Sequence, residues 1–436
     1  MSIDRRDFLK VATAGAGLAV TGTPVAGAVP SSMRSALVRS GQAPDVVVVG
    51  AGNFGLWTAL NLQRMGARVT VIDQYGPGNS RSASGGETRG VRTSYGDRPQ
   101  GLQWGQWAAR AIQKWKDWDE EYTEAQLPRL FHTTGDIIMR DEMTPFLEDT
   151  VLNWETMGHD HEILTADEIR YRWPVIHTPD VNVGIYEPAA GVVRARRAME
   201  SVARVFEQEG GQIIVQRAAM GRVEGRQVVD IELEGGDRVT GGLFVFALGP
   251  WFPKFFPALM GRRLSNRSLG HVYYFSTPPG DESYRWPNCP SYNVPGVTGW
   301  PVMPNDARGF RIRTGGHRGD DPDNSVRWVD SSFHDRPRSV LAKYFPALAE
   351  RVINETRACH YTGSVSRNFI IDEHPEYDNG WLAGGGSAES FKQGPVLGEF
   401  IAGRVMGTET DEELNESFAL LEEEFEVDGN DQEDDA

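Results

Sequence analysis

The chain alternates short apolar runs with longer amphipathic stretches. Residues 45–49 (DVVVV) form a β-branched run, typical of a strand that is buried on both faces of a parallel sheet. A helical pattern follows at 56–66 (LWTALNLQRMG), and then a second apolar run at 67–73 (ARVTVID). Strand, helix and strand in this order predict a βαβ unit and therefore a parallel sheet.

Two later stretches extend this pattern. Residues 191–215 predict a loop, an amphipathic helix and a strand, and residues 243–249 predict a buried strand that ends in a small-residue turn. The segments 96–185 and 260–350 are richer in Trp, Tyr and Pro, with alternating runs such as 310–313 (FRIR). The alternation predicts a second, mostly antiparallel sheet that roofs a pocket.

The predicted fold class is therefore α/β, with a Rossmann-type nucleotide-binding domain and a mostly antiparallel substrate domain. The predicted boundaries are a leader at 1–28, a linker at 29–43, a discontinuous nucleotide-binding domain at 44–95, 186–259 and 351–408, a substrate domain at 96–185 and 260–350, and an acidic tail at 409–436 with a short helix at 418–425.

The length, cysteine count and net charge of the chain exclude some classes of protein. With 436 residues the chain is long enough for two or three cores, and its two cysteines exclude a disulfide scaffold. The net charge of −17 argues against a nucleic-acid partner, which would require a basic face. Residues 411–436 hold 13 acidic residues and no Lys or Arg, so the rest of the chain is nearly neutral.

The first 28 residues have the layout of an export signal. Arg5 and Arg6 precede a short Ala/Gly-rich apolar run, which ends in the small residues Ala26, Gly27 and Ala28. The paired arginines predict export by the twin-arginine machinery to a periplasmic or extracellular location. The alternative is an amphipathic helix with two chance arginines. No other run reaches membrane-spanning length, so we expect no membrane partner.

A glycine motif, GAGNFG, joins the first strand to the first helix. Gly50 permits the tight turn, Gly52 lets the backbone approach a pyrophosphate, and Gly55 allows the helix to pack on the strand. Asp73 ends the next strand, where a carboxylate accepts hydrogen bonds from ribose hydroxyls. The motif alone does not separate FAD from NAD. The predicted nucleotide-binding residues at this turn are Gly50, Gly52, Asn53, Phe54, Gly55 and Asp73.

Three blocks make a family resemblance specific. They are 45–55 with Asp73, 85–97 (GGETRGVRTSYGD) and 358–399, which combines a Cys-x-Tyr-Thr turn, a Phe-Ile-Ile-Asp strand and a Gly-rich loop. On these blocks the chain resembles the D-amino-acid-oxidase superfamily, and within it the monomeric sarcosine oxidase/N-methyltryptophan oxidase group, over roughly residues 45–407. The resemblance implies FAD, with its ring between the two domains.

The activity implied by this resemblance is oxidation of the C–N bond of an amino acid or N-methyl amino acid. The products are an imine, which water hydrolyses, and H₂O₂ from O₂. We expect a monomer that acts on a small molecule. Two alternatives stay open: an amine dehydrogenase that passes electrons to another acceptor, and a non-catalytic flavoprotein subunit.

Several site residues follow from the resemblance. Cys359 matches the cysteine that forms a thioether to the flavin; a buried free thiol and a disulfide with Cys289 are the alternatives. Arg89 matches an arginine close to the flavin ring. Gly385 and Gly386 belong to a Gly-rich loop that lets backbone N–H groups approach the flavin.

The implied substrate-binding side chains are cationic. Arg92 and Lys392 match the pair that binds the substrate carboxylate, and Lys392 also lies beside the cofactor. Tyr361 lines the same pocket, with an ordinary core tyrosine as its alternative. The implied catalytic set is Arg92, Lys392, Arg311 and Tyr361, and no metal site is expected.

The chain departs from the group's pattern at three places. Arg311 stands where the oxidases carry a lysine that promotes electron transfer to O₂. Glu389 replaces a histidine three residues before the Phe-Lys lysine, so it either weakens anion binding or receives a cationic group of a larger substrate. Ser84 and Gly85 replace a histidine pair. The substrate therefore does not carry over from sarcosine oxidase.

Overall fold

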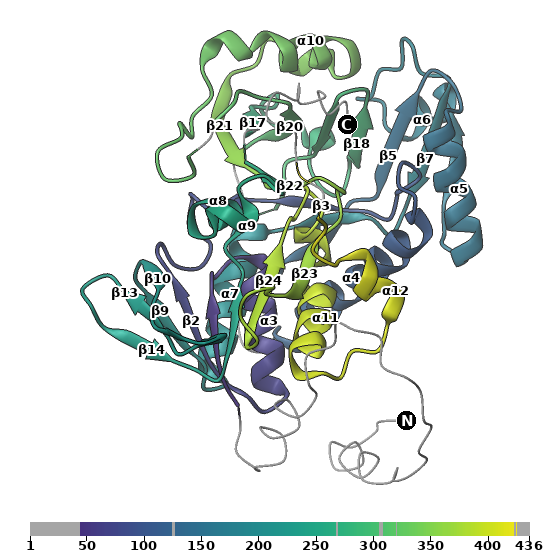
Figure 1. Ribbon diagram of the computed structural model, residues 1–436. Coiled ribbons are helices and arrows are strands. Elements are labelled where there is room, and N and C mark those ends of the chain that lie inside the picture. Colours follow the sequence, from purple (N-terminus) through teal and green to yellow (C-terminus); the bar gives the residue numbers. More distant parts are fainter. Residues whose placement is uncertain are drawn as a thin grey trace.

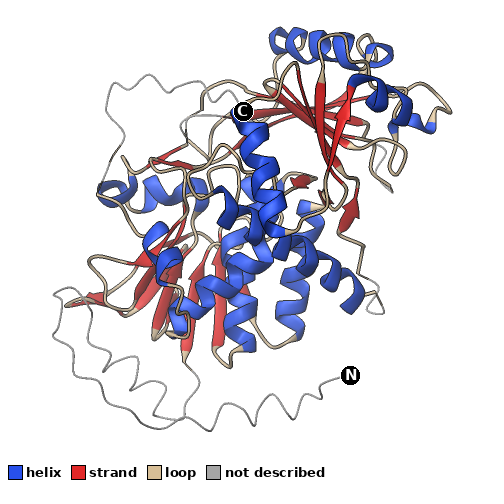
Figure 2. Cartoon of the chain, turned by 90° about the vertical axis from the view of Figure 1, so that its right-hand side faces the viewer, coloured by secondary structure: helices blue, strands red, loops and turns tan. Residues whose placement is uncertain are grey.

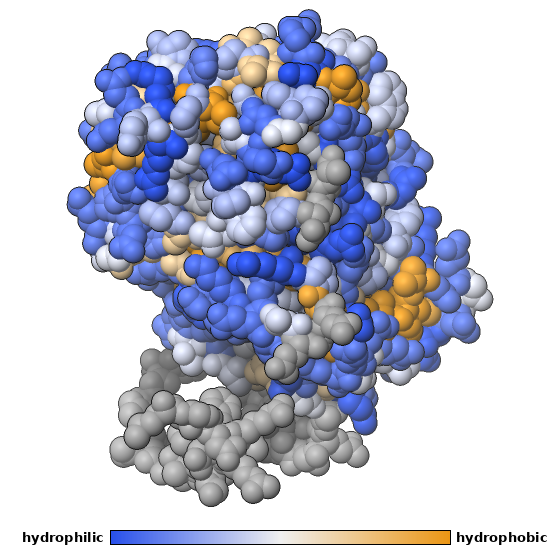
Figure 3. Space-filling view, turned by 180° about the vertical axis from the view of Figure 1, so that it is seen from behind, coloured by the Kyte–Doolittle hydropathy of each residue, from blue (hydrophilic) through white to orange (hydrophobic). Residues whose placement is uncertain are grey.

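The computed structural model describes residues 44–123, 127–266, 269–304, 308–319, 321–422 and 424, which form two lobes (Figure 1). The predicted leader at 1–28 and linker at 29–43 lie outside the described residues. Among the described helices, none is both long enough and apolar enough to span a bilayer. The surface seen from behind is mainly hydrophilic, with a few separate apolar patches (Figure 3).

The lower lobe is built on a six-stranded sheet. Its order is β23 (Ile370–Glu373), β24 (Gly380–Gly384), β15 (Leu243–Phe246), β1 (Asp45–Val49), β2 (Arg68–Asp73) and β9 (Gln212–Val215). All neighbours run parallel except β23 and β24. The apolar runs at 45–49, 67–73 and 243–249 therefore form central parallel strands, as their patterns predict.

Four helices share one apolar core with this sheet: α3 (Asn53–Arg64), α4 (Gly101–Glu121), α7 (Ala195–Gln208) and α11 (Gly394–Met406). Helix α11 approaches α3 closely because Gly398 faces Trp57, where an added Cβ would lie 2.5 Å from the Trp57 Cβ. Helix α4 packs its tryptophans, such as Trp115, against Trp57 at 5.4 Å between ring centroids. The predicted boundary placed α4 in the other domain, but its aromatic stripe buries it here.

The upper lobe is built on an eight-stranded sheet. Its order is β21 (Ile353–His360), β17 (Leu269–Phe275), β20 (Phe310–Thr314), β19 (Val297–Trp300), β18 (Ser291–Val294), β5 (Asp136–Arg140), β7 (Val183–Glu187) and β6 (Glu162–Thr165). Only the pair β18–β5 is parallel, which confirms a mostly antiparallel second domain. Strand β21 and the last two residues of β7 fall in segments predicted for the nucleotide-binding domain.

The two faces of this sheet have different surroundings. One face buries Ile137, Tyr273 and Tyr292 in an apolar core that α6 (Ala166–Arg172) and α10 (Asp335–Tyr344) help to close. Figure 2 shows helices above the upper sheet. Because strand side chains alternate between faces, the neighbouring residues point to the opposite side, toward the lower lobe.

Smaller sheets and helices complete the described fold. The additional sheets are β3 (Arg89–Val91), β8 (Gly191–Val193) and β4 (Phe131–Thr133); β10 (Ala218–Met220), β13 (Asp230–Leu233) and β14 (Arg238–Thr240); β11 (Val223–Glu224) and β12 (Gln227–Val228); and β16 (Leu264–Ser265) and β22 (Gly363–Ser364). The remaining helices are α5 (Pro145–Met157), α8 (Phe252–Phe255), α9 (Pro257–Met260) and α12 (Glu412–Ser417).

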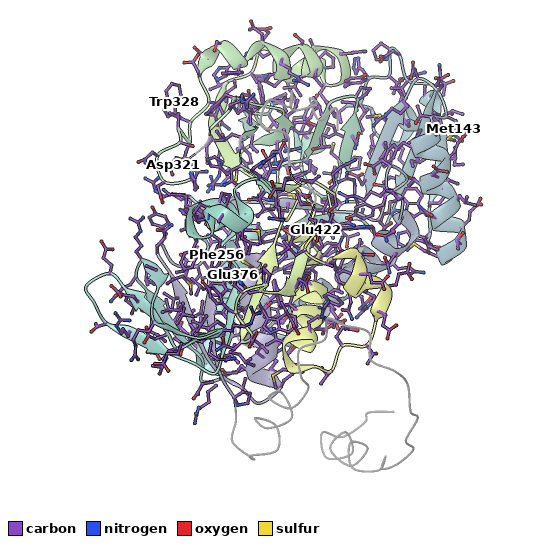
Figure 4. All side chains as sticks on the ribbon, in the orientation of Figure 1. Met143, Phe256, Asp321, Trp328, Glu376 and Glu422 are labelled. Carbon is purple, nitrogen blue, oxygen red and sulfur yellow. The ribbon has the colours of Figure 1, made fainter. Side chains whose placement is uncertain are left out.

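The first part of the predicted acidic tail is packed on the lower lobe. Asp411 caps α12 by accepting a hydrogen bond from the Leu414 N–H, and the Ile371 N–H donates to the Phe418 carbonyl at 2.7 Å. The predicted helix at 418–425 is wrong over 418–422, where Phe418 instead turns into the core. The segment then continues along the surface, where the Arg263 Nε–H donates to the Leu421 carbonyl at 2.8 Å, and Figure 4 labels the exposed Glu422 near the centre of its view.

Candidate active site

A cavity of about 2010 Å³ lies between the lobes and brings together almost all the predicted site residues. Its lining contains Gly50, Gly52, Asn53, Phe54, Asp73, Arg89, Arg92, Arg311, Cys359, Tyr361, Gly385, Gly386 and Lys392. Gly55 is the exception, because it faces the Gly50 backbone, where an added Cβ would lie 1.8 Å from the Gly50 oxygen. Gly55 therefore serves packing, as predicted, and the others surround one space.

The turn after β1 forms one end of this cavity. Gly50 has a φ of +118°, and an added Cβ would lie 2.2 Å from the Ala247 carbonyl oxygen, so only glycine fits. Asp73 accepts hydrogen bonds from the N–H groups of Ala51, Tyr75 and Gly76, each at 2.8 Å. Burial raises the pKa of Asp73, and these bonds oppose the rise. Asp73 thus fixes the turn while it faces the cavity.

The N-terminus of α3 points at the same end. Asn53 donates its backbone N–H to the Ser84 hydroxyl at 2.9 Å and its side-chain amide to the Ser390 carbonyl at 2.9 Å. No local sequence pattern predicts this role of Ser84, which lies 31 residues from Asn53. Other N–H groups in the first turn have no partner within the helix and carry its positive dipole end. The cradle has the chemistry that a pyrophosphate requires.

Cys359 lies near the end of β21 among arginines. Burial opposes ionisation of its thiol, but Arg357, Arg89 and Arg327 outweigh burial and lower its pKa. Cys289 is also a free thiol, and it is buried in the upper core on the other face of the sheet. The structure therefore contradicts the disulfide alternative for Cys359.

The partly buried Arg89 and the buried Arg311 are two cations near Cys359. Arg89 donates to the carbonyls of Thr88 and Ala83. Arg311 is 3% exposed, and its Cζ lies 3.5 Å from the Trp300 ring centroid. Its Nε and Nη1 have no hydrogen-bond partner among the described residues. Burial, with Arg89 nearby, lowers the pKa of Arg311 to about 9.

Arg92 and Lys392 line another part of the cavity, and the carboxylate of Glu389 lies beside them. The Lys392 ammonium contacts a Glu389 carboxylate oxygen, and the Tyr95 hydroxyl donates to the same oxygen at 3.1 Å. Arg98 lies 4.0 Å from the other oxygen. Burial opposes the Glu389 charge, but Lys392 and Arg92 hold its pKa down at about 2. Burial lowers the pKa of Lys392 to about 8, although Glu389 offsets part of the change.

A buried carboxylate fixes the segment after Arg92. Glu187, at the end of β7, accepts hydrogen bonds from the Thr93 N–H at 2.9 Å and the Thr93 hydroxyl at 2.8 Å. His159 lies 3.0 Å from Glu187, and Trp154 donates to the Thr93 hydroxyl at 2.7 Å. Glu187 is 94 residues from Thr93, so local sequence patterns could not reveal this support.

Tyr361 and Asp136 complete the polar lining. Tyr361 is partly buried and faces the cavity beside Arg313, whose Cζ lies 5.7 Å from its ring centroid. Asp136, the first residue of β5, also lines the cavity, and sequence reasoning missed it. Its only signal is an acidic residue at the start of an otherwise apolar run, DIIM.

A comparison with family models identifies one match. The model described as "DAO: FAD dependent oxidoreductase" matches residues 45–404, which covers both lobes and the cavity between them.

In the part of the chain that the structure describes, no group of three or more His, Cys, Asp or Glu residues is placed to hold a metal ion.

Similar proteins agree with this match. Monomeric sarcosine oxidase of a Bacillus species is 24% identical over 364 residues, covering 82% of this chain and 92% of that protein. N-methyl-L-tryptophan oxidase of Citrobacter koseri is 25% identical over 83% of this chain and 95% of its own length. Amadoriase I of Aspergillus fumigatus, a fructosyl amine:oxygen oxidoreductase, has the same fold, with a TM-score of 0.72 at 22% identity over 85% of this chain and 88% of that chain.

Proposed function

The chain belongs to the family of FAD-dependent oxidoreductases, and on that premise we propose that it oxidises the C–N bond of an amino acid or N-methyl amino acid. The observation that supports the proposal is a single cavity that joins the dinucleotide cradle of β1 and α3 to the partly buried Arg92 and the buried Lys392. The cradle holds the cofactor, and the cations hold the substrate.

The residues present fit FAD. A Cβ at position 50 would fill the turn, the α3 N-terminus offers free N–H groups to the pyrophosphate, and Asp73 faces the ribose position. Gly385 has a φ of +65° and lines the cavity, so backbone can approach the ring there. When bound, the flavin supplies the chemistry of hydride acceptance from carbon.

The protein contributes orientation and charge. Arg92 donates its Nε–H to Ser94 at 2.9 Å, which directs the rest of its guanidinium toward the cavity, where it binds the substrate carboxylate. Lys392 adds a second positive charge at this place. Holding the carboxylate fixes the reacting carbon relative to the cofactor, and this placement is the main catalytic effect of these side chains. Water then hydrolyses the imine product.

Anaerobic titration of the purified holoenzyme tests the proposal. We expect at least one of a panel of primary and N-methyl amino acids to bleach the flavin absorbance, and we expect H₂O₂ when air is admitted. A holoenzyme whose flavin no amine reduces would contradict the proposal and favour a non-catalytic flavoprotein.

Arg311 supports a second candidate, a dehydrogenase with the same substrate half-reaction. A guanidinium retains the positive charge but has a larger, planar head than an ammonium, and here it stacks on Trp300. The proposal for an oxidase requires that this charge promotes electron transfer to O₂. Rapid reduction by substrate with slow reoxidation by air would identify the dehydrogenase.

We propose in addition that Cys359 is bonded to the flavin 8α-methyl carbon. The lowered pKa of the thiol favours the nucleophilic thiolate. The new S–C bond replaces the thiol S–H and one methyl C–H bond, and the two electrons released pass to the enzyme's acceptor. Acid precipitation should leave the yellow colour in the pellet for the wild type and in the supernatant for Cys359→Ser.

The N-terminal sequence supports a proposal about location. Because Arg5 and Arg6 precede a short apolar run, the protein is exported in folded form by the twin-arginine pathway. A separate part of the proposal is that the mature protein acts as a monomer. Replacing both arginines with lysine should retain the protein in the cytoplasmic fraction. Sedimentation of the mature protein tests its oligomeric state.

A further inference from the structure

One carboxylate oxygen buried in the cavity has no hydrogen-bond partner among the described residues. It is Oδ2 of Asp136, a residue that is 8% exposed. Burying an ionised carboxylate without a partner is unfavourable, so such a group calls for an explanation. Because Asp136 lines the cavity, a ligand there can supply the missing partner.

The strand registers place Asp136 on the cavity face of the upper sheet. Arg311 pairs with Trp300, and Asp136 pairs with Ser291 on one side and Glu187 on the other. Since Tyr292 opposes Gly299, Ser291 lies next to Trp300, and all these side chains share one face. Three steps of about 4.8 Å between strands separate the backbones of Arg311 and Asp136 by about 14 Å.

Near Asp136, the described residues include no ion-pair partner within 4.0 Å for either the Arg92 guanidinium or the Asp136 carboxylate. Lys392 is in contact with Glu389, which also receives the Tyr95 hydroxyl. Arg92 is close enough to Asp136 for each to stabilise the other's charge, but no ion pair joins them within 4.0 Å among the described residues. The substrate end therefore offers a guanidinium and a carboxylate at separate places.

We propose that Asp136 binds a second, positively charged nitrogen of the substrate, so that the preferred substrates are amino acids or N-alkyl amino acids with an ammonium or guanidinium side chain. This inference rests on the proposed function. The reacting nitrogen is not the group that Asp136 holds, because it must be uncharged, with a free lone pair, when hydride leaves the neighbouring carbon. Arg92 binds the carboxylate of the same molecule.

Glu389 is the other carboxylate in reach, and its contacts make it the weaker candidate for this role. Its oxygens already meet Lys392, Tyr95 and Arg98, so an incoming cation would have to displace an existing partner. Asp136 has no such competitor. Glu389 instead reduces the positive charge that Lys392 presents, which suits a substrate with no net negative charge.

A matched pair of substrates tests the proposal on the holoenzyme. Nα-methyl-lysine and N-methylnorleucine differ in the terminal ammonium, and we expect the wild type to favour the lysine derivative by roughly 10- to 100-fold in kcat/KM, the range of one charge-assisted hydrogen bond. Asp136→Asn should remove this preference because the lysine derivative loses its ionic contact, whereas Asp141→Asn, an exposed carboxylate just past the same strand, should retain it.

Equal use of the two substrates by the wild type, or a preference that survives in Asp136→Asn, would overturn the proposal. Binding of unreactive ligands separates it from the proposed function. With 5-guanidinopentanoate and hexanoate, shifts of the flavin spectrum should show tighter binding of the guanidinium ligand to the wild type, even if no amine is oxidised. Similar affinities for the two ligands would refute the role of Asp136 independently of turnover and of any variant's folding.

Discussion

The two charged ends of the cavity differ in what holds their cations. Near Cys359, Arg89 and Arg327 donate to backbone carbonyls, Arg311 stacks on Trp300, and no described carboxylate pairs with any of the three within 4.0 Å. Near Arg92, the cations stand among carboxylates, with Glu389 in contact with Lys392. The cations near Cys359, which no described carboxylate neutralises, suit a permanently bound, electron-rich cofactor. The cations near Arg92, which carboxylates partly neutralise, suit a substrate that must bind and dissociate.

The strongest test of this contrast removes the substrate end's main cation. Arg92→Gln should lower kcat/KM by about 100- to 1000-fold, because a bidentate, charge-assisted contact with the carboxylate is lost. Stopped-flow reduction of the flavin measures the effect, and flavin content should stay unchanged. A loss below threefold would show that the carboxylate binds elsewhere.

At the cofactor end, Arg311→Met should act on the opposite half-reaction. Loss of the fixed positive charge should slow reoxidation by O₂ by about 10- to 100-fold and leave reduction by substrate nearly unchanged. Mixing the reduced enzyme with aerated buffer measures the rate. If Arg311→Met slows reduction and reoxidation equally, the division between the two ends is wrong.

Glu389→Gln should sharpen the contrast by making the substrate end resemble the other. With its carboxylate removed, Lys392 is free to bind an anion, so the affinity for a simple carboxylate such as hexanoate should rise about tenfold. Titration of the flavin spectrum near pH 7 measures the Kd. Unchanged or weaker binding would mean that Glu389 does not compete with the ligand.

The smallest expected effect is on stability. Burial raises the pKa of Asp136 from its ordinary value of 3.8 to about 6; Glu187 adds to the rise, while Arg92, Lys392 and Arg140 oppose it. The folded state therefore favours the protonated acid, and its ionisation destabilises the fold above pH 6 but not below pH 4.

Asp136→Asn should consequently raise the Tm of the ligand-free protein by about 2–4 °C at pH 8, with the gain vanishing toward pH 4. Differential scanning calorimetry at both pH values measures it. A lower Tm at pH 8 would indicate that Asp136 has a stabilising partner in the fold.

The sequence was informative wherever structure and chemistry are local. The run at 45–49, the glycine motif and Asp73 lie within one βαβ unit, so their spacing predicts both the sheet and the nucleotide end of the cavity. Family resemblance then placed Arg92, Lys392 and Cys359 in one cavity, where the structure has them.

The missed features depend on pairing between distant segments. Asp136 and Glu187 become neighbours only through the register of β5 and β7, and Glu187 reaches Thr93 across 94 residues. Helix α4 was assigned to the wrong lobe because an amphipathic pattern shows that one face is buried but not against which partner.

The packing of Phe418 has a consequence for the order in which the chain matures. Its ring contacts Trp104 and Trp107 of α4, Phe369 before β23, and Phe400 of α11, with ring centroids 5.2–6.1 Å apart. A ribosome completes residue 418 about three hundred residues after Trp104, so the lower lobe cannot finish its core before residue 418 has been made. The aromatic core of the lower lobe is therefore complete only once residue 418 has joined it.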